Sequence, residues 1–347
     1  MVKILYAMAQ EGMGHAIRSK VIIEMLLKRH TVRVIAGGRS FIYLSRYFKY
    51  IHRMFNFELV YTNNSINKLL TCLYNLIKFP FIFIYNLKII KLIVAFKPDI
   101  IITDFDLFSN YLSTLFDIPL ISIDNQHLVT KCDIKIPKKH VKDYLISYLI
   151  IKLVVNKAQN YFITSFFFPK TKHKNVFLFP PILRDEILRL DAKKGDHILV
   201  YQTSKSYKAM FEVFKKINQK FIIYGFDMDY NEKNLVFRKF NEKSFFNDLA
   251  KCKAVITNGG FTLISEALCL KKPVLSIPIR HQFEQILNAL YIKRLGYGAY
   301  HDFLTEENLG EFLSNLSKYG ENLKKYPRGD NSAILTKLET VLKRFEQ

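Results

Sequence analysis

The stretch that decides the fold runs from Ala254 to Gly298 and reads AVITNGGFTLISEALCLKKPVLSIPIRHQFEQILNALYIKRLGYG. Its first four residues are an apolar run that predicts a buried strand, and Gly259-Gly260 then predicts a turn into a helix over Thr262–Leu270. A helix that begins there has free backbone N–H groups in its first turn, which can bind an anion. A second strand, Pro273–Ile277, and a second helix follow. This order is typical of a parallel, doubly wound sheet.

Polar residues occur at defined points of this stretch. Glu266 lies four residues into the first helix, beyond the turn where a carboxylate would act as a simple cap, and it could accept two ribose hydroxyls. Glu284, Gln285 and Asn288 fall at i, i+1 and i+4, so we expect them to converge at the start of the second helix. Each feature alone also fits a purely structural role, as a turn or a solvated helix face. Together, in one βαβα unit, they indicate a nucleotide site.

The segment resembles the donor-binding signature of the two-Rossmann-domain nucleotide-sugar glycosyltransferases (GT-B type). It is most similar to the branch of UDP-glucuronosyltransferases and the peptidoglycan N-acetylglucosaminyltransferase. The resemblance implies that the glycine pair holds the diphosphate, that Glu266 holds the ribose, and that Glu284 and Gln285 reach the donor sugar. Asn258 stands where many members have a histidine. The donor-binding residues expected on this basis are Gly12, Gly14, Ser204, Asn258, Gly259, Gly260, Thr262, Glu266, Glu284, Gln285 and Asn288.

Composition bounds the class of protein. The chain has 347 residues, half of them hydrophobic (50%), which is enough for two globular domains. Its four cysteines form no CxxC pair, so we expect buried, reduced thiols and a cytoplasmic location. The net charge of +22 points to an anionic partner, either a nucleotide diphosphate, a nucleic acid or anionic lipid. The charge could equally come from an AT-rich genome.

The N-terminal residues predict a second glycine loop. Ile4–Met8 is an apolar strand without the features of a secretory signal, and Gly12 to Arg18 has the pattern Gly-x-Gly-His-x-x-Arg before a helix. Ligands of open α/β sheets bind at the carboxyl ends of strands, which favours a functional over a structural role for His15. The resemblance implies that His15 is the general base and that Asp104 orients it through the second ring nitrogen.

A long apolar and basic run lies between Leu59 and Pro98 and contains no acidic residue. Because Lys78 and Pro80 interrupt it, it predicts two shorter helices and not a membrane span. The helix from Tyr85 to Phe96 is expected to cover the sheet with Leu87, Ile90 and Val94 inward. The helix from Lys68 to Phe83 could lie either in a core or in a membrane interface with its lysines at the head groups.

We therefore expect an α/β protein with two Rossmann-like domains that face each other across a cleft. The first comprises residues 1–180, with a helix at 331–347 packed back on it, and the second comprises residues 195–330. The expected function is transfer of a hexosyl group from a nucleotide-diphosphate sugar, UDP-linked, to a hydroxyl of a lipid-linked or hydrophobic acceptor. No metal or other cofactor is expected. The protein is expected in the cytoplasm, at the inner face of the membrane. A nucleotide-sugar hydrolase, an epimerase and a basic nucleic-acid binder are the alternatives.

Overall fold

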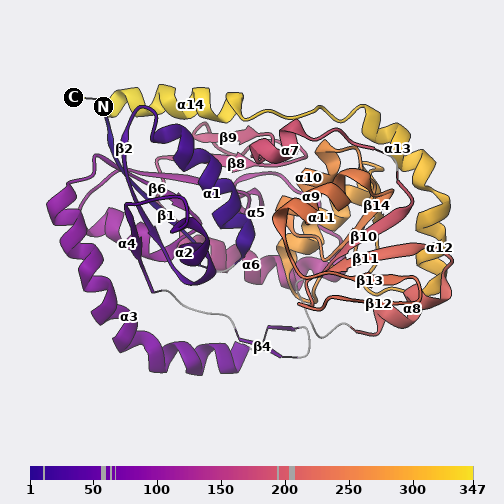
Figure 1. The fold of residues 1–347 in the computed structure, drawn as a ribbon. Helices are drawn as coiled ribbons and strands as arrows, with labels where there is room; N and C mark the ends of the chain where they lie inside the picture. Colours follow the sequence, from indigo (N-terminus) through magenta and orange to yellow (C-terminus); the bar gives the residue numbers. More distant parts are fainter. Residues whose placement is uncertain are drawn as a thin grey trace. The chain divides into compact units, whose positions relative to one another are not determined.

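The computed structural model describes residues 1–10, 12–55, 60–62, 65–66, 68–193, 195–202 and 208–346. The chain divides into two compact units. Unit 1 contains residues 1–60, 66–182 and 330–347, and unit 2 contains residues 61–65 and 183–329. Each unit is built on a seven-stranded sheet with helices (Figure 1), so the predicted α/β class with two Rossmann-like sheets is confirmed.

All neighbouring strands of the sheet in unit 1 are parallel. Their order across the sheet is β3 (Ile51–Arg53), β2 (Thr31–Ala36), β1 (Lys3–Met8), β6 (Ile100–Asp104), β7 (Leu120–Asp124), β8 (Asn160–Thr164) and β9 (Val176–Phe179). The central strands β6 and β7 are buried along their whole length, because helices cover both faces. Since the strands are parallel, the residues that follow β1, β6 and β7 meet at one edge.

The helices of unit 1 are α1 (Met13–Leu26), α2 (Gly38–Leu44), α3 (Lys68–Phe96), α4 (Leu107–Leu115), α5 (Leu128–Lys131), α6 (Val141–Val154) and α14 (Ser332–Leu342), with 3-10 turns η1 (Lys138–His140) and η2 (Lys343–Phe345). The C-terminal α14 returns to this unit, as the ribbon shows (Figure 1). Its residues Ile334, Leu338 and Leu342 are buried in the same core as β1 and α1.

Helix α3 corrects the expectation of two shorter helices. It is one helix and not two, although it bends by 50° between Leu69–Ile82 and Ile84–Phe96. Pro80 lies inside it and removes one backbone hydrogen bond near the bend. None of the described helices alone is long and apolar enough to cross a membrane, but the two arms of α3 together meet that requirement in length and composition.

The predicted inward face of α3 is wrong by one position. Asn86, Ile89 and Ile93 are each 2% exposed, whereas Leu87 and Val94 are 41% and 59% exposed. Asn86 sets this rotation, because its side chain accepts from the backbone N–H of Phe55 and donates to the carbonyl oxygen of the same residue at 3.0 and 2.8 Å. Cys72, in the same helix, is exposed and not buried as predicted.

Unit 2 has the strand order β12 (Tyr230–Glu232), β13 (Leu235–Phe237), β11 (Lys220–Tyr224), β10 (His197–Tyr201), β14 (Ala254–Thr257), β15 (Val274–Ser276) and β16 (Gly298–Tyr300). Only the β12–β13 pair is antiparallel. Its helices are α7 (Asp185–Arg189), α8 (Met210–Lys216), α9 (Glu242–Lys251), α10 (Phe261–Cys269), α11 (Phe283–Arg294), α12 (Glu306–Ser314) and α13 (Leu316–Lys324). A separate two-stranded sheet joins β4 (Tyr61–Thr62) and β5 (Ser65–Ile66). Strand β14 has the predicted bounds.

Candidate active site

The glycine loop after β1 places His15 in the first turn of α1. Gly12 is the residue before this helix and has a φ of +87°, a conformation that favours glycine over residues with a Cβ. Gly14 lies in the first turn itself. The side chain of His15 is 12% exposed, so part of the ring is accessible.

His15 contacts Asp104, as the resemblance to the glycosyltransferases implied. Asp104 is the last residue of β6 and pairs in register with Met8 at the end of β1. Its Oδ1 lies 2.7 Å from Nδ1 of His15. A carboxylate on Nδ1 keeps the proton there and leaves the lone pair on Nε2, which is the form of histidine that acts as a base.

Arg18 is the third member of this group. Its Nε donates to Oδ2 of Asp104 at 2.6 Å, and its Nη2 donates to Oδ1 of the same carboxylate. Burial raises the pKa of Asp104, but the charge of Arg18 and the contact with His15 outweigh burial and hold that pKa below its usual range. Asp104 is therefore an ionised acceptor at neutral pH. From the sequence, Arg18 was only the end of the loop pattern, although its i, i+3 spacing from His15 on a helix places the two side chains on one face.

Two residues after β7 complete the network. Arg18 Nη1 donates to Oδ1 of Asn125 at 2.6 Å. The side-chain nitrogen of Gln126 lies 3.3 Å from Nε2 of His15. Both are buried, at 3% and 6% exposure. The sequence placed them at a strand end on the functional edge without giving them a role.

A second histidine–carboxylate pair lies next to this network, but both ring nitrogens of its histidine already have partners. His127 Nδ1 is 2.6 Å from Oδ2 of Asp124, and its Nε2 faces the carbonyl oxygen of Val155 at 3.2 Å. Burial raises the pKa of Asp124, but the contacts with His127 and with the Ser122 hydroxyl outweigh it and lower the pKa to about 2. Since both ring nitrogens are engaged and both side chains are 1% exposed, we assign this pair to structure and not to catalysis.

In unit 2 the turn after β14 requires a glycine at position 259. Gly259 has a φ of +95°, and a Cβ there would lie 2.8 Å from both Ser276 Oγ and the carbonyl oxygen of Gln285. Asn288 donates to the carbonyl oxygen of Gly259 at 3.0 Å. Gly260 precedes α10, whose start has no side-chain cap. Backbone N–H groups in the first turn of a helix can bind an anion, and Thr262 lies in that turn, so diphosphate binding here stays a prediction.

The expected convergence of polar groups at the start of α11 holds only in part. Gln285 accepts from the backbone N–H of Ile279 at 3.0 Å, so its oxygen and the amide of Asn288 fix loops around the turn. Glu284 lies in the first turn of α11. Asn258 donates to the carbonyl oxygen of Ile277 at 3.3 Å. Ser204 lies outside the described residues.

Glu266 has a partner that the sequence did not predict. It is 2% exposed, and its Oε1 accepts from Nε and Nη2 of Arg184 at 2.8 and 2.6 Å. Arg184 also lies 3.3 Å from Glu242 and 4.3 Å over the ring of Phe246. Burial raises the pKa of Glu266, and Arg184 opposes that rise. Binding of a ribose by Glu266 stays a prediction.

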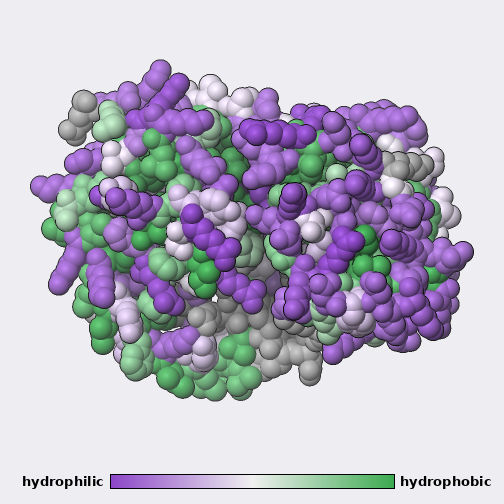
Figure 2. Space-filling view, viewed as in Figure 1, coloured by the Kyte–Doolittle hydropathy of each residue, from purple (hydrophilic) through white to green (hydrophobic). Residues whose placement is uncertain are grey.

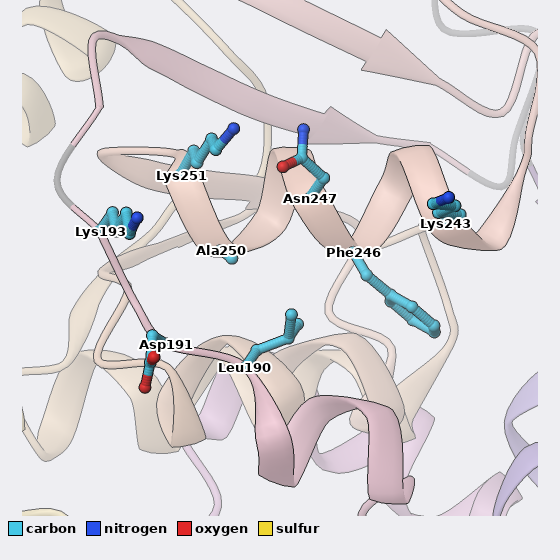
Figure 3. A pocket seen from close by; sticks show the side chains of 8 residues that line it. All are labelled: Leu190, Asp191, Lys193, Lys243, Phe246, Asn247, Ala250 and Lys251. Carbon is cyan, nitrogen blue, oxygen red and sulfur yellow. The ribbon is translucent and has the colours of Figure 1, made fainter.

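A depression of about 470 Å³ lies beside α9 in unit 2. Leu190, Phe246 and Ala250 supply apolar parts of its lining, and Lys193, Lys243 and Lys251 supply charges (Figure 3). It includes none of the predicted donor-binding residues, so we do not place the donor there. Among the described residues, no cluster of three or more His, Cys, Asp or Glu could hold a metal ion.

Comparison with known sequences identifies a family and one relative. The profile described as Glycosyl transferase family 1 matches residues 2–317. A stretch of 97 residues is 32% identical to UDP-N-acetylglucosamine--N-acetylmuramyl-(pentapeptide) pyrophosphoryl-undecaprenol N-acetylglucosamine transferase 3 of Bacillus cereus. That stretch covers 25% of this chain and only 27% of the relative, so the likeness spans about a quarter of each.

Solved structures share the fold along the whole chain. UGT2 of Phytolacca americana, complexed with UDP-2-fluoro-glucose and pterostilbene, superposes with a TM-score of 0.69 at 14% identity and covers 99% of both chains. MurG of Acinetobacter baumannii gives a TM-score of 0.60 at 13% identity and also covers 99% of both chains. These matches confirm the expected GT-B fold.

Proposed function

The chain belongs to glycosyl transferase family 1, and we propose that it transfers a hexosyl group from a UDP-sugar to a hydroxyl of a lipid-linked acceptor. The observation that carries this proposal is the His15–Asp104 contact at the functional edge of unit 1. A glycosyltransferase needs a base for the attacking hydroxyl, and His15 has the orientation that base catalysis requires.

In the proposed reaction, Nε2 of His15 takes the proton of the acceptor hydroxyl. The acceptor oxygen forms a bond to the anomeric carbon, and the bond from that carbon to the diphosphate oxygen breaks. Asp104 stabilises the imidazolium that results, because its carboxylate faces Nδ1 at 2.7 Å. The nucleotide diphosphate leaves with the bonding electrons.

Unit 2 would hold the donor. The uncapped start of α10 supplies N–H groups for the diphosphate, and Glu266 would accept ribose hydroxyls. The exposed Arg280 can add positive charge near the leaving group. With helix N–H groups and a cation to neutralise the diphosphate, we propose that the reaction requires neither a metal nor another cofactor.

The acceptor side of the proposal rests on the surface of unit 1. Hydrophobic residues gather along α3, at the lower left of Figure 2. Leu76, Ile77 and Phe81 of α3 are 62–71% exposed, and Leu153 of α6 is 72% exposed. Such apolar surface next to lysines fits a membrane interface. The relative from Bacillus cereus is named for a pyrophosphoryl-undecaprenol substrate, which supports a lipid-linked acceptor. We therefore propose that the protein acts at the inner face of the membrane.

The test uses UDP-N-acetylglucosamine, the donor in the name of the relative, followed by a panel of other nucleotide sugars. Thermal unfolding should shift upward with UDP, since a ligand bound only by the folded chain stabilises it. Release of UDP should be slow with donor alone and rise at least tenfold when a membrane extract with the acceptor is added.

A nucleotide-sugar hydrolase of the same fold is the second candidate, because the Gly12–Arg18 loop pattern also fits that class. Rapid formation of free sugar from donor alone, unaffected by the extract, would favour the hydrolase and reject the transferase. His15→Ala should reduce either activity about a hundredfold or more. The exposed His173 provides the matched control, and His173→Ala should keep full activity.

A further inference from the structure

The amide of Gln126 is held across Nε2 of His15 in one orientation. Its Oε1 lies 3.3 Å from the backbone nitrogen of Asn125 and 3.5 Å from Nη2 of Arg18. A peptide N–H and a guanidinium can only donate, so the amide oxygen must face them. The NH₂ group of Gln126 consequently faces the imidazole, 3.3 Å from Nε2.

The other side of the ring is also fixed. Asp104 is ionised and can only accept, so Nδ1 of His15 carries the proton and donates to it. Arg18 Nη2 also lies 2.8 Å from Nδ1, but neither group has a lone pair to offer, and both donate to Oδ1 of Asp104. Neutral imidazole then has a single in-plane lone pair at Nε2. Gln126 donates to that lone pair.

We propose that Gln126 is a positioning residue that prevents His15 from activating water until an acceptor is bound. This inference rests on the proposed role of His15 as the base. The lone pair that must receive the hydroxyl proton is already occupied, so a nucleophile has to displace the amide. Water brings no other binding energy to this displacement, whereas an acceptor held elsewhere on the protein does. Gln126 thereby favours transfer over hydrolysis.

The activity test compares Gln126→Met, which keeps the side-chain length and removes the amide, with the wild-type chain. With UDP-N-acetylglucosamine alone, hydrolysis should rise at least tenfold. With membrane extract added, transfer should stay within about threefold, so the ratio of transfer to hydrolysis falls. Gln159→Met is the matched control, because Gln159 is exposed in the same unit and should keep the wild-type ratio. An unchanged ratio in Gln126→Met would reject the inference.

A second readout needs no substrate. The chain has nine histidines, and the ring ¹⁵N resonances of His15 are identified as those lost in His15→Ala. In the wild type we expect a protonated Nδ1 and an unprotonated, hydrogen-bonded Nε2. In Gln126→Met the Nε2 resonance should move toward the value of a free lone pair while Nδ1 stays in place. Identical Nε2 resonances in the two proteins, or a proton on Nε2, would overturn the inference.

The two hypotheses fail in different ways. If His15→Ala keeps transfer, the proposed base is wrong whatever Gln126 does. If His15→Ala loses both reactions while Gln126→Met leaves the ratio and the Nε2 resonance unchanged, only the role of Gln126 is rejected. Circular dichroism and thermal unfolding establish that each variant is folded, and Gln126→Ala replaces Gln126→Met if the latter is not.

Discussion

Arg184 and Glu266 form a buried ion pair, with Nη2 of the arginine 2.6 Å from Oε1 of the glutamate. Their side chains are 5% and 2% exposed. Arg184 lies near the start of the long segment of unit 2, residues 183–329, and Glu266 lies in the middle of α10. The pair thus ties the start of this segment to the helix whose first turn is the candidate diphosphate site.

The first prediction concerns the stability that this pair gives. Arg184→Met should destabilise the chain by about 3–5 kcal/mol at neutral pH, because it leaves a buried carboxylate without its cation. Glu242 is the outer partner of Arg184, and its side chain is 39% exposed. Glu242→Ala should therefore cost less than about 1 kcal/mol. Urea unfolding of both variants and the wild type measures the difference. Equal losses would contradict the assignment.

The sign of the pH dependence follows from the raised pKa of Glu266. When the folded pKa exceeds the unfolded value, the folded chain binds more protons between the two, and stability falls as the pH rises through that range. Loss of Arg184 removes the effect that opposes burial, so the folded pKa rises further. Arg184→Met should therefore be closer to wild-type stability at pH 5 than at pH 8. A larger loss at pH 5 would contradict this.

The second prediction concerns the nucleotide. If Glu266 accepts ribose hydroxyls, Glu266→Ala should weaken UDP binding by about 2–3 kcal/mol, the range for hydrogen bonds to a charged group. Because the substitution also leaves Arg184 with only the partly exposed Glu242 as an ionic partner, Arg184→Met has to be titrated beside it. Weakening in Glu266→Ala that exceeds the weakening in Arg184→Met isolates the direct contact. Isothermal titration with UDP measures both, and unchanged affinity in folded Glu266→Ala would reject the ribose role.

The third prediction concerns the buried Asp124–His127 pair in unit 1. Asp124 has a folded pKa of about 2, below its usual value, so it stabilises the fold above the unfolded pKa and this contribution is lost as the pH falls toward 2. The difference between this folded pKa and the usual pKa of an aspartate corresponds to about 2 kcal/mol of stability. Asp124→Asn should show at least this loss at pH 7, and its unfolding free energy should fall less steeply between pH 5 and pH 3. Asp133→Asn, at an exposed aspartate, should keep the wild-type slope.

Much of the fold follows from local pattern alone. Strand β14 has the predicted bounds and β1 begins one residue before its predicted start, because short apolar runs that end at turn residues favour buried strands. That His15 and Asp104 lie at one edge of the sheet followed from the parallel strands, whereas their direct contact was implied only by the resemblance to the glycosyltransferases.

Other features depend on contacts between distant residues, which periodicity does not encode. The rotation of α3 is set by Asn86 against the backbone of Phe55, 31 residues earlier. Arg184 meets Glu266 across 82 positions, and Arg18 meets Asp104 across 86. A single sequence gives no sign of such pairs, so the burial of Glu266 and the size of the His15 network were not predictable.

The last prediction tests α3 as a membrane-binding element. Leu76 and Ile77 are 70% and 71% exposed, so replacing both by glutamate removes no core packing. Burying two such side chains in a bilayer is worth about 1.5–3 kcal/mol each, and the double variant should therefore bind anionic vesicles at least tenfold more weakly. The exposed Lys88 and Lys91 of the same helix add attraction to anionic lipid, about 1 kcal/mol per lysine near the surface. Wild-type binding should consequently fall as salt is added.

Co-sedimentation with vesicles of neutral and of anionic lipid, at low and high salt, separates these two contributions. The control is Phe303→Glu, at an apolar residue of unit 2 that is also exposed (59%), and it should leave binding unchanged because α3 is intact. A double variant that binds as the wild type does would remove α3 from the interface. Equal binding to neutral and anionic vesicles, or no binding to anionic ones, would assign the net charge of +22 to genome composition, because a charge used at the membrane must distinguish the two lipids.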